Sequence, residues 1–184
     1  AKGMFTGFIR VKGKPWGLIA NNPLFLAGAI DSNGADKASR FIKLCENYNI
    51  PILSLCDTPG MMVGPEVEET GLVRHCCRMF LAGANVTVPM VTIVLRKAYG
   101  LGAQAMAGGS FMAPQFVVGW PTAEIGAMGL EGAVKLGYRK ELEAETNEEK
   151  KESLFKKLVD ELYEKGKAIN AASLLEFDTV LDPI

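Results

Sequence analysis

Two short and almost continuously apolar runs, at residues 52–56 and 90–95, constrain the fold of this chain more than any other feature. Runs of this length and composition are typical of strands buried within a sheet. A helical pattern precedes the first run and ends before Pro51; its apolar members are Ala35, Ala38, Ile42 and Cys45. Strands that alternate with helices predict the α/β class.

The remaining elements are predicted from turn chemistry and from shorter patterns. Asp31, Ser32 and Asn33 can each cap the helix that ends before Pro51. The other predicted elements are strands at residues 8–11, 16–21, 115–120 and 123–127, a loop at 96–103 and a short helix at 130–136.

Residues 73–84 carry the clearest helical pattern in the sequence. Apolar side chains recur there at i, i+3, i+4, i+7, i+8 and i+11, namely Val73, Cys76, Cys77, Phe80, Leu81 and Ala84. Such a stripe is typical of a helix face that packs on the core, which is the interpretation we favour. The alternative is a face left bare for another subunit.

Residues 139–167 differ in composition from the rest of the chain. Of these 29 residues, 17 are charged, and Thr146 with Glu149 forms a possible capping box. One apolar stripe remains, made of Leu154, Phe155, Leu158, Val159, Leu162 and Tyr163. We predict a surface helix docked by one face within a single domain spanning residues 1–184; a dedicated partner-binding helix is the alternative.

Composition excludes several classes of protein. The 184 residues are 48% apolar and 22% charged with a net charge of −1, which gives no indication of nucleic acid or an acidic membrane as partner. No apolar run is long enough to span a membrane, and the N-terminus lacks the core of a signal peptide. The four cysteines contain no C-x-x-C pair and His75 is the single histidine, so a zinc site is hard to assemble. We therefore expect free thiols in a cytoplasmic protein.

The usual catalytic motifs are missing. There is no G-x-S-x-G elbow, no H-E-x-x-H and no phosphate-binding P-loop. His75 lies beside the apolar stripe of its helix, which favours a structural or surface role, and Ser110 has no evident basic partner.

Glycines stand where the chain turns after each of the two apolar runs. Gly60 follows the first run, and Gly100 and Gly102 follow the second. Backbone N–H groups freed at such turns favour negative charge and can stabilise an oxyanion without a side-chain acid. The pattern is equally compatible with glycines that only allow tight turns.

A dinucleotide-binding turn is the main competing enzyme hypothesis. Gly100, Gly102 and Ala105 match G-x-G-x-x-[GA], with Glu124 at a suitable distance downstream. Against it, residues 96–99 separate the predicted strand from the first glycine, whereas a nucleotide turn follows its strand directly.

Motifs spread over nearly the whole chain carry a more specific resemblance. They include residues 17–23 (GLIANNP), 28–31 (GAID), 36–41 (DKASRF), 57–60 (DTPG), 96–100 (RKAYG) and 120–125 (WPTAEI). In register, they resemble the C-terminal domain of the carboxyltransferase (beta) subunit of biotin-dependent acyl-CoA carboxylases of the propionyl-CoA and acetyl-CoA type. The resemblance implies a crotonase-like α/β fold, a spiral of β-β-α units, where periodicity alone leaves a doubly wound sheet open.

The resemblance also implies a division of labour between two such domains. The N-terminal one binds acyl-CoA, and the C-terminal one, similar to this chain, receives carboxybiotin on a carrier protein and takes part in carboxyl transfer to the α-carbon of the acyl group. Implied partners are the N-terminal carboxyltransferase domain, the biotin carboxyl carrier and the biotin carboxylase subunit, in a homo-oligomer that is cytoplasmic, or in the mitochondrial matrix of a eukaryote. No metal is implied.

The resemblance places the site residues on two loops. The oxyanion amides fall on Leu101 and Gly102, or on Gly102 and Ala103 if the loop shifts by one residue, and Gly100, Gly102 and Ala103 are the expected biotin-binding residues. The expected residues on the acyl-CoA side are Pro59, Gly60 and Gln104. After the tyrosine, many members have Gly-Gly-Ala, an aromatic residue and then an aspartate, so the Gln104 difference concerns the acyl-CoA substrate.

Two alternatives remain within this hypothesis. A subunit of a biotin-dependent acyl-CoA decarboxylase or transcarboxylase shares the domain and differs in its partners. A non-catalytic crotonase-like interaction module is the alternative from another class.

Overall fold

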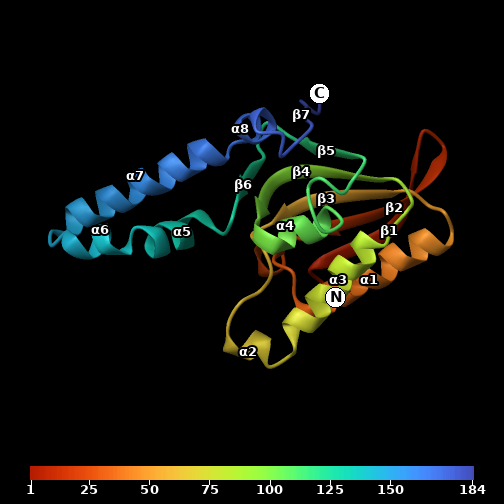
Figure 1. Cartoon of the computed structure of the whole chain (residues 1–184), viewed down its shortest axis with the longest axis horizontal. Helices are drawn as coiled ribbons and strands as arrows, with labels where there is room; N and C mark the ends of the chain where they lie inside the picture. The colour runs from red at the N-terminus through yellow and green to blue at the C-terminus, as the bar shows by residue number, and fades with distance from the viewer.

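The structure is a computed structural model that describes all 184 residues. Seven strands form one sheet in the order β1-β2-β3-β4-β5-β7, and β6 pairs with the far end of β4 (Figure 1). Only β1 and β2 are antiparallel. The strands are β1 (Met4–Val11), β2 (Lys14–Asn21), β3 (Ile52–Thr58), β4 (Met90–Tyr99), β5 (Phe116–Gly119), β6 (Glu124–Gly126) and β7 (Thr179–Val180).

Helices follow most of the parallel strands, which confirms the α/β class. They are η1 (Leu26–Gly28), α1 (Ser32–Asn47), α2 (Pro65–Glu68), α3 (Leu72–Ala84), α4 (Gly100–Met106), α5 (Leu130–Gly137), α6 (Arg139–Ala144), α7 (Glu148–Gly166) and α8 (Ala168–Ser173). Of the three candidate caps of α1, Asp31 is the one used, because its carboxylate accepts a 2.6 Å hydrogen bond from the N–H of Gly34. The predicted apolar stripe of α1 is fully buried.

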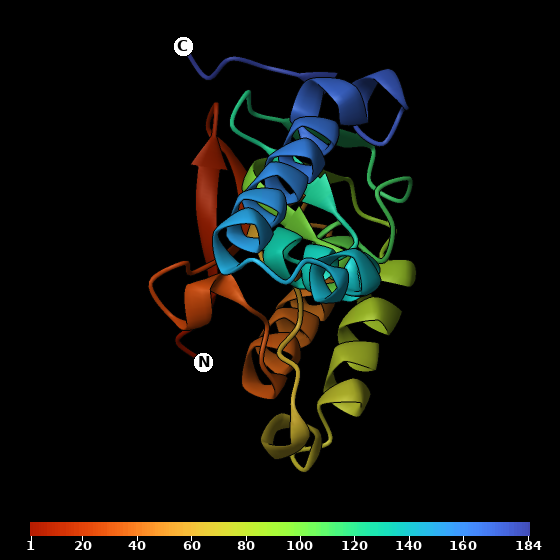
Figure 2. The ribbon, with the colours of Figure 1, turned by 90° about the vertical axis from the view of Figure 1, so that its left-hand side faces the viewer.

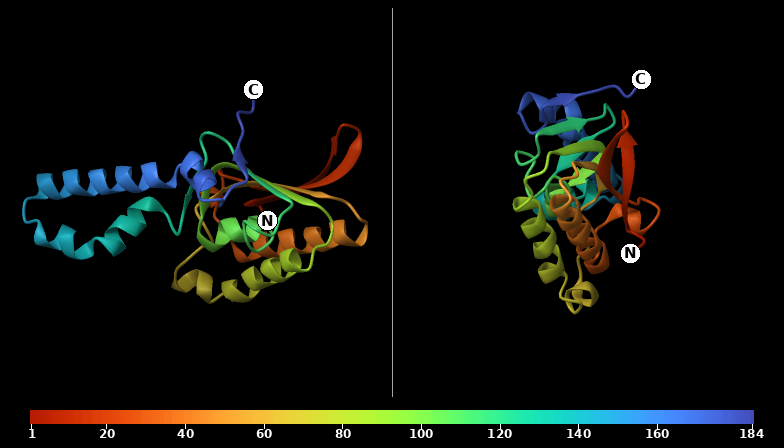
Figure 3. Two further views of the ribbon diagram at one scale, coloured as in Figure 1. Left: turned by 45° about the horizontal axis from the view of Figure 1, so that its top comes forward. Right: turned by 90° about the vertical axis from the view of Figure 1, so that its right-hand side faces the viewer.

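The two faces of the sheet are unequally covered. Helices α1, α3 and α4 lie on one face, where the side chains of Ile19, Ile52 and Val94 are buried (Figure 3). No helix lies over the opposite face of β1 to β4, and the apolar side chains there are half-buried or exposed. They form two rows across the strands, Leu18–Leu53–Val91–Phe116 and Ala20–Leu55–Ile93. We call these two rows the bare sheet face.

The apolar stripe predicted on α3 is only partly correct. Cys76 is buried as expected, but the side chains of Val73 and Leu81 are 71% and 62% exposed. The buried residues of this helix, which packs on α1, are Leu72, Cys76, Met79, Ala82 and Gly83. Apolar residues occur on both sides of this helix, so the period alone does not identify the buried side.

The charged segment is a hairpin of helices rather than one long helix. Helices α5 and α6 run out from the sheet and α7 returns, forming an arm that projects from the body (Figures 1 and 2). A small core of Val134, Leu142 and Leu158 holds the arm together, so α7 packs by one face as predicted. The capping-box prediction is wrong: Asn147, not Thr146, caps α7, by accepting a 3.1 Å hydrogen bond from the N–H of Lys150.

The four cysteines are all free, as expected from their spacing. Burial raises the pKa of the Cys56 thiol to about 12, so this thiol stays protonated. His75 joins two helices, because its Nδ1 lies 2.9 Å from Oδ2 of Asp36. None of the helices has the length and hydropathy needed to cross a membrane.

Candidate active site

The start of α4 is the centre of the candidate site. Strand β4 continues to Tyr99, so the predicted loop at residues 96–103 is wrong, because Lys97 and Tyr99 pair with Glu124 and Gly126 of β6. Helix α4 therefore begins directly after its strand. This removes the spacing argument against a dinucleotide-binding turn.

Gly100 makes the turn from strand to helix. Its φ is +56°, and a Cβ there would lie 2.9 Å from the carbonyl oxygen of Ala127. Both the left-handed backbone and the close approach require glycine. The sequence pattern could suggest the turn, but not the segment that presses against it.

The first backbone N–H groups of α4 have no acceptor within the helix. Within α4 they belong to Gly100, Leu101 and Gly102, three of the residues expected at the biotin and oxyanion site. Ala103, the fourth expected residue, lies four positions after the N-cap Tyr99, so its N–H has the Tyr99 carbonyl oxygen as acceptor. The side chain of Leu101 is 61% exposed, whereas Gly102 and Ala103 are buried. The helix start thus combines polar N–H donors with an exposed apolar side chain.

Gly60 lies against the start of α4. A Cβ on Gly102 would lie 2.6 Å from the carbonyl carbon of Gly60 and 2.8 Å from its Cα, so the two backbones are in direct contact. The two glycine turns predicted to share a site are therefore adjacent. No side chain fits at Gly102 without moving one of these loops.

The expectation that Gly60 offers a free N–H is wrong. That N–H donates to the hydroxyl oxygen of Thr58 at 3.1 Å. The carbonyl oxygen of Gly60 accepts from the N–H of Ile30 at 3.0 Å. Gly60 therefore shapes the wall beside α4 and donates nothing to a ligand.

Asp57 ties the ends of β3 and β4 together. The register between these strands shifts at this point, between Cys56 and Thr58. The Asp57 carboxylate accepts a 3.2 Å hydrogen bond from the N–H of Lys97 and lies 3.3 Å from the guanidinium of Arg96. It therefore holds the part of β4 that leads into Gly100.

We expect Asp57→Ala to lower the free energy of unfolding by about 1–3 kcal/mol, because the N–H of Lys97 loses its acceptor. Urea denaturation of the chain measures this. Arg96→Ala is the matched control. It should cost less than about 1 kcal/mol, since the Arg96 side chain is half exposed and its ion pair with Asp57 is partly solvated. A larger loss for Arg96→Ala than for Asp57→Ala would show that the ion pair, not the backbone contact, matters.

Tyr99 and Glu124 form a buried polar pair directly before α4. Both residues are less than a tenth exposed. Burial and the neighbouring Glu124 carboxylate raise the pKa of the Tyr99 hydroxyl, which therefore stays protonated. Sequence reasoning did not single out this pair as a unit; the signal was a glutamate within an otherwise apolar strand.

The expected acyl-CoA residues Pro59 and Gln104 are both half-buried. Gln104 follows Gly100 by one helical turn on α4. Pro59 directly precedes Gly60. The structure thus gathers all the predicted site residues onto two adjoining segments, residues 59–60 and 100–104.

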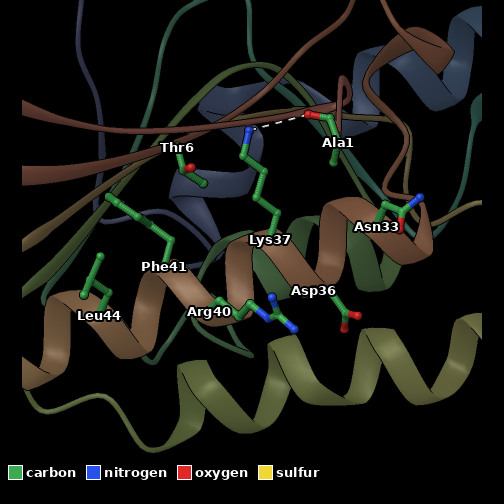
Figure 4. A pocket seen from close by; sticks show the side chains of 8 residues that line it. All are labelled: Ala1, Thr6, Asn33, Asp36, Lys37, Arg40, Phe41 and Leu44. Carbon is green, nitrogen blue, oxygen red and sulfur yellow. Dashed lines mark hydrogen bonds between the residues drawn. The ribbon is translucent and has the colours of Figure 1, made fainter.

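A separate hollow of about 510 Å³ lies between β1 and α1, away from these residues (Figure 4). Its Lys37 ammonium is already committed, donating to the carbonyl oxygen of Met4 at 2.7 Å. Asp36, on its rim, pairs with His75 and Arg78. No cluster of three or more His, Cys, Asp or Glu side chains is arranged to hold a metal ion anywhere in the chain.

Comparison with known proteins gives consistent matches over the whole chain. A family profile described as "Carboxyl transferase domain" matches residues 1–184. A solved structure titled as a single-chain, multi-domain long-chain acyl-CoA carboxylase is 55% identical with a TM-score of 0.89, over 98% of this chain and 18% of that one.

Two further matches come from smaller proteins. The transcarboxylase 12S crystal structure, titled as a hexamer assembly, is 36% identical with a TM-score of 0.89, over 100% of this chain and 35% of that one. The propionyl-CoA carboxylase beta chain of Cereibacter sphaeroides is 43% identical over 77% of this chain and 28% of its own length. The chain therefore spans about a third of the curated relatives that it matches.

Proposed function

We propose that this chain, which belongs to the carboxyl transferase domain family, forms the biotin-side half of a biotin-dependent acyl-CoA carboxyltransferase. Its crotonase-like fold, which it shares with its solved relatives, supports the proposal. One observation carries the proposal: the start of α4 presents backbone N–H groups beside the Gly60 turn. Membership in this family is also the argument against a dinucleotide-binding turn, now that the spacing between strand and first glycine no longer excludes one.

The residues at this site fit biotin. The ureido group of biotin has an oxygen that accepts hydrogen bonds, and the first N–H groups of α4 are donors without intrahelical acceptors. The rings are uncharged and largely apolar, which suits the contact between glycine backbones and the exposed Leu101. Bound carboxybiotin would supply the carboxyl group.

The chain's own residues would then act by position. Leu101 and Gly102 donate their N–H groups to an oxygen on which negative charge develops, and such donors are effective when held rigid. We favour this pair over Gly102 and Ala103, because the N–H of Ala103 has an acceptor within the helix. Rigidity comes from the contact of Gly102 with Gly60 and from the Asp57 bridge between β3 and β4. No side chain of this half is required as acid or base.

The remaining parts of the reaction lie outside this chain. We infer an N-terminal carboxyltransferase domain that binds acyl-CoA, a biotin carboxyl carrier and a biotin carboxylase, assembled as a homo-oligomer. The names of the relatives support such an assembly, since they include a carboxylase beta chain and a hexameric transcarboxylase. The free thiols suit a reducing compartment, and we place the enzyme in the cytoplasm.

The experiment that tests this function uses the intact enzyme and a carboxylated biotin carrier. We expect labelled carboxyl to move from the carrier to acyl-CoA. Carboxyl transfer between two acyl-CoA substrates without ATP would instead identify a transcarboxylase, and release of CO₂ a decarboxylase. Failure to bind or discharge the carrier would favour the non-catalytic interaction module.

We propose that Gln104 helps to select the acyl-CoA, because it lies one helical turn from the oxyanion amides and is half-buried. In the intact enzyme, Gln104→Asp should change the ratio of kcat/KM between acetyl- and butyryl-CoA by about tenfold or more, the scale of one or two methylene groups in a pocket. Gln104→Asn is the matched control, since it shortens the side chain without adding charge. An unchanged ratio in the aspartate variant would remove Gln104 from the acyl pocket.

A further inference from the structure

An apolar groove of about 290 Å³ lies at the base of the arm, between β6 and the helices α5 and α7. We call it the arm-base groove. Apolar side chains from three elements line it: Ile125, Met128, Leu130, Ala133 and Leu162. Lys165 is its one charged lining residue. A ligand for this groove is therefore apolar rather than ionic.

The arm-base groove adjoins the candidate active site. Ala127, which lines the groove, presents the carbonyl oxygen that lies 2.9 Å from the Cβ position of Gly100. Gly126, also in the groove, packs against the Tyr99 ring, with 3.1 Å from its Cβ position to the ring. The floor of the groove is thus the segment that presses on the start of α4.

The walls of the groove are fixed in place. A Cβ on Gly166 would lie 2.5 Å from the carbonyl oxygen of Ile125, so the end of α7 is in backbone contact with β6. The N–H of Ala168 donates to the carbonyl oxygen of Ala123 at 2.8 Å. The groove is therefore preformed where the arm joins the sheet, as a ligand site requires.

We infer that the arm-base groove binds the distal part of the acyl chain of a long-chain acyl-CoA. This inference rests on the proposed function, which places the reacting end of the acyl group beside α4. The groove adjoins that point through residues 126 and 127, it is apolar, and the 55% identical relative is titled a long-chain acyl-CoA carboxylase. Burial of each methylene group strengthens binding by about fourfold, so a few groups in the groove give a strong preference.

The test measures binding apart from turnover. The intact enzyme, without the biotin carrier, is titrated with acetyl-CoA and with palmitoyl-CoA below its micelle-forming concentration. We expect palmitoyl-CoA to bind at least tenfold tighter, and Ala133→Phe, which fills the groove, to reduce this ratio by about tenfold or more. Met128→Asp, at a 42% exposed position, gives a second variant that does not depend on repacking. Leu136→Phe, 72% exposed on α5 and outside the groove, is the control and should keep the ratio.

Two outcomes would overturn the inference. One is a ratio that stays at the parental value in both groove variants. The other is an equal loss of affinity for both esters, which would mean that another part of the protein covers the groove. Carboxyl transfer is assayed separately: an enzyme that binds long acyl chains through the groove but transfers no carboxyl refutes only the proposed function.

Discussion

In the intact enzyme, Gly102→Val should lower the rate of carboxyl transfer by about 100-fold to 1000-fold, the effect of losing one oxyanion donor. Gly102 belongs to both candidate donor pairs. The structure adds a steric reason, because even a Cβ there would lie 2.6 Å from the Gly60 carbonyl carbon. One of the two loops must move, and the N–H groups of α4 move with it. A displacement of about 1 Å is enough for a loss of this size.

Transfer from carboxylated carrier to acyl-CoA measures this effect, and thermal unfolding shows whether the variant is folded. Gly137→Val is the matched control, since a Cβ at Gly137 on α5 meets nothing within 4 Å. It should transfer carboxyl at close to the parental rate. A folded Gly102→Val enzyme with near-parental transfer would place the oxyanion site elsewhere.

The 184-residue chain alone should show no turnover above background. It holds one set of backbone donors at α4, and in the proposed division of labour a separate domain binds the acyl-CoA. Mixing the chain with free biotin and malonyl- or methylmalonyl-CoA, and measuring decarboxylation, tests this. The intact enzyme under the same conditions is the positive control.

The result is informative only if the chain is folded, which circular dichroism and a cooperative urea transition establish. Turnover by the folded chain would refute the division of the site between two domains. If Gly102→Val abolished that turnover, the whole reaction would have to be assigned to this domain.

Much of the fold could be predicted because the first helix carries one clear periodicity and the central strands are short apolar runs. The buried stripe of α1 followed from apolar spacing, and β3 and the first part of β4 followed from their continuous apolar runs. Helix α3 did not, because Val73 and Leu81 are as apolar as the buried Leu72 and Met79. A period identifies a face only when the opposite face is polar.

The site shows a similar division. The glycines at both turns were visible, but the partner of each backbone group depends on distant segments. The Thr58 hydroxyl oxygen accepts the hydrogen bond from the N–H of Gly60. Strand β4 is longer than predicted because residues 97–99, which the sequence predicts as loop, pair with β6. Strand β7 has only two residues, Thr179 and Val180, and no local pattern reveals a pairing that short.

The bare sheet face has a thermodynamic consequence. Apolar rows on β2 to β5 that stay in contact with water contribute little to folding until another surface covers them. Anything that binds the folded chain there, including further copies of itself, raises its apparent stability by mass action. The melting temperature of the chain should therefore rise with the concentration of the chain. A measured free energy of unfolding then applies only to the protein concentration at which it was measured.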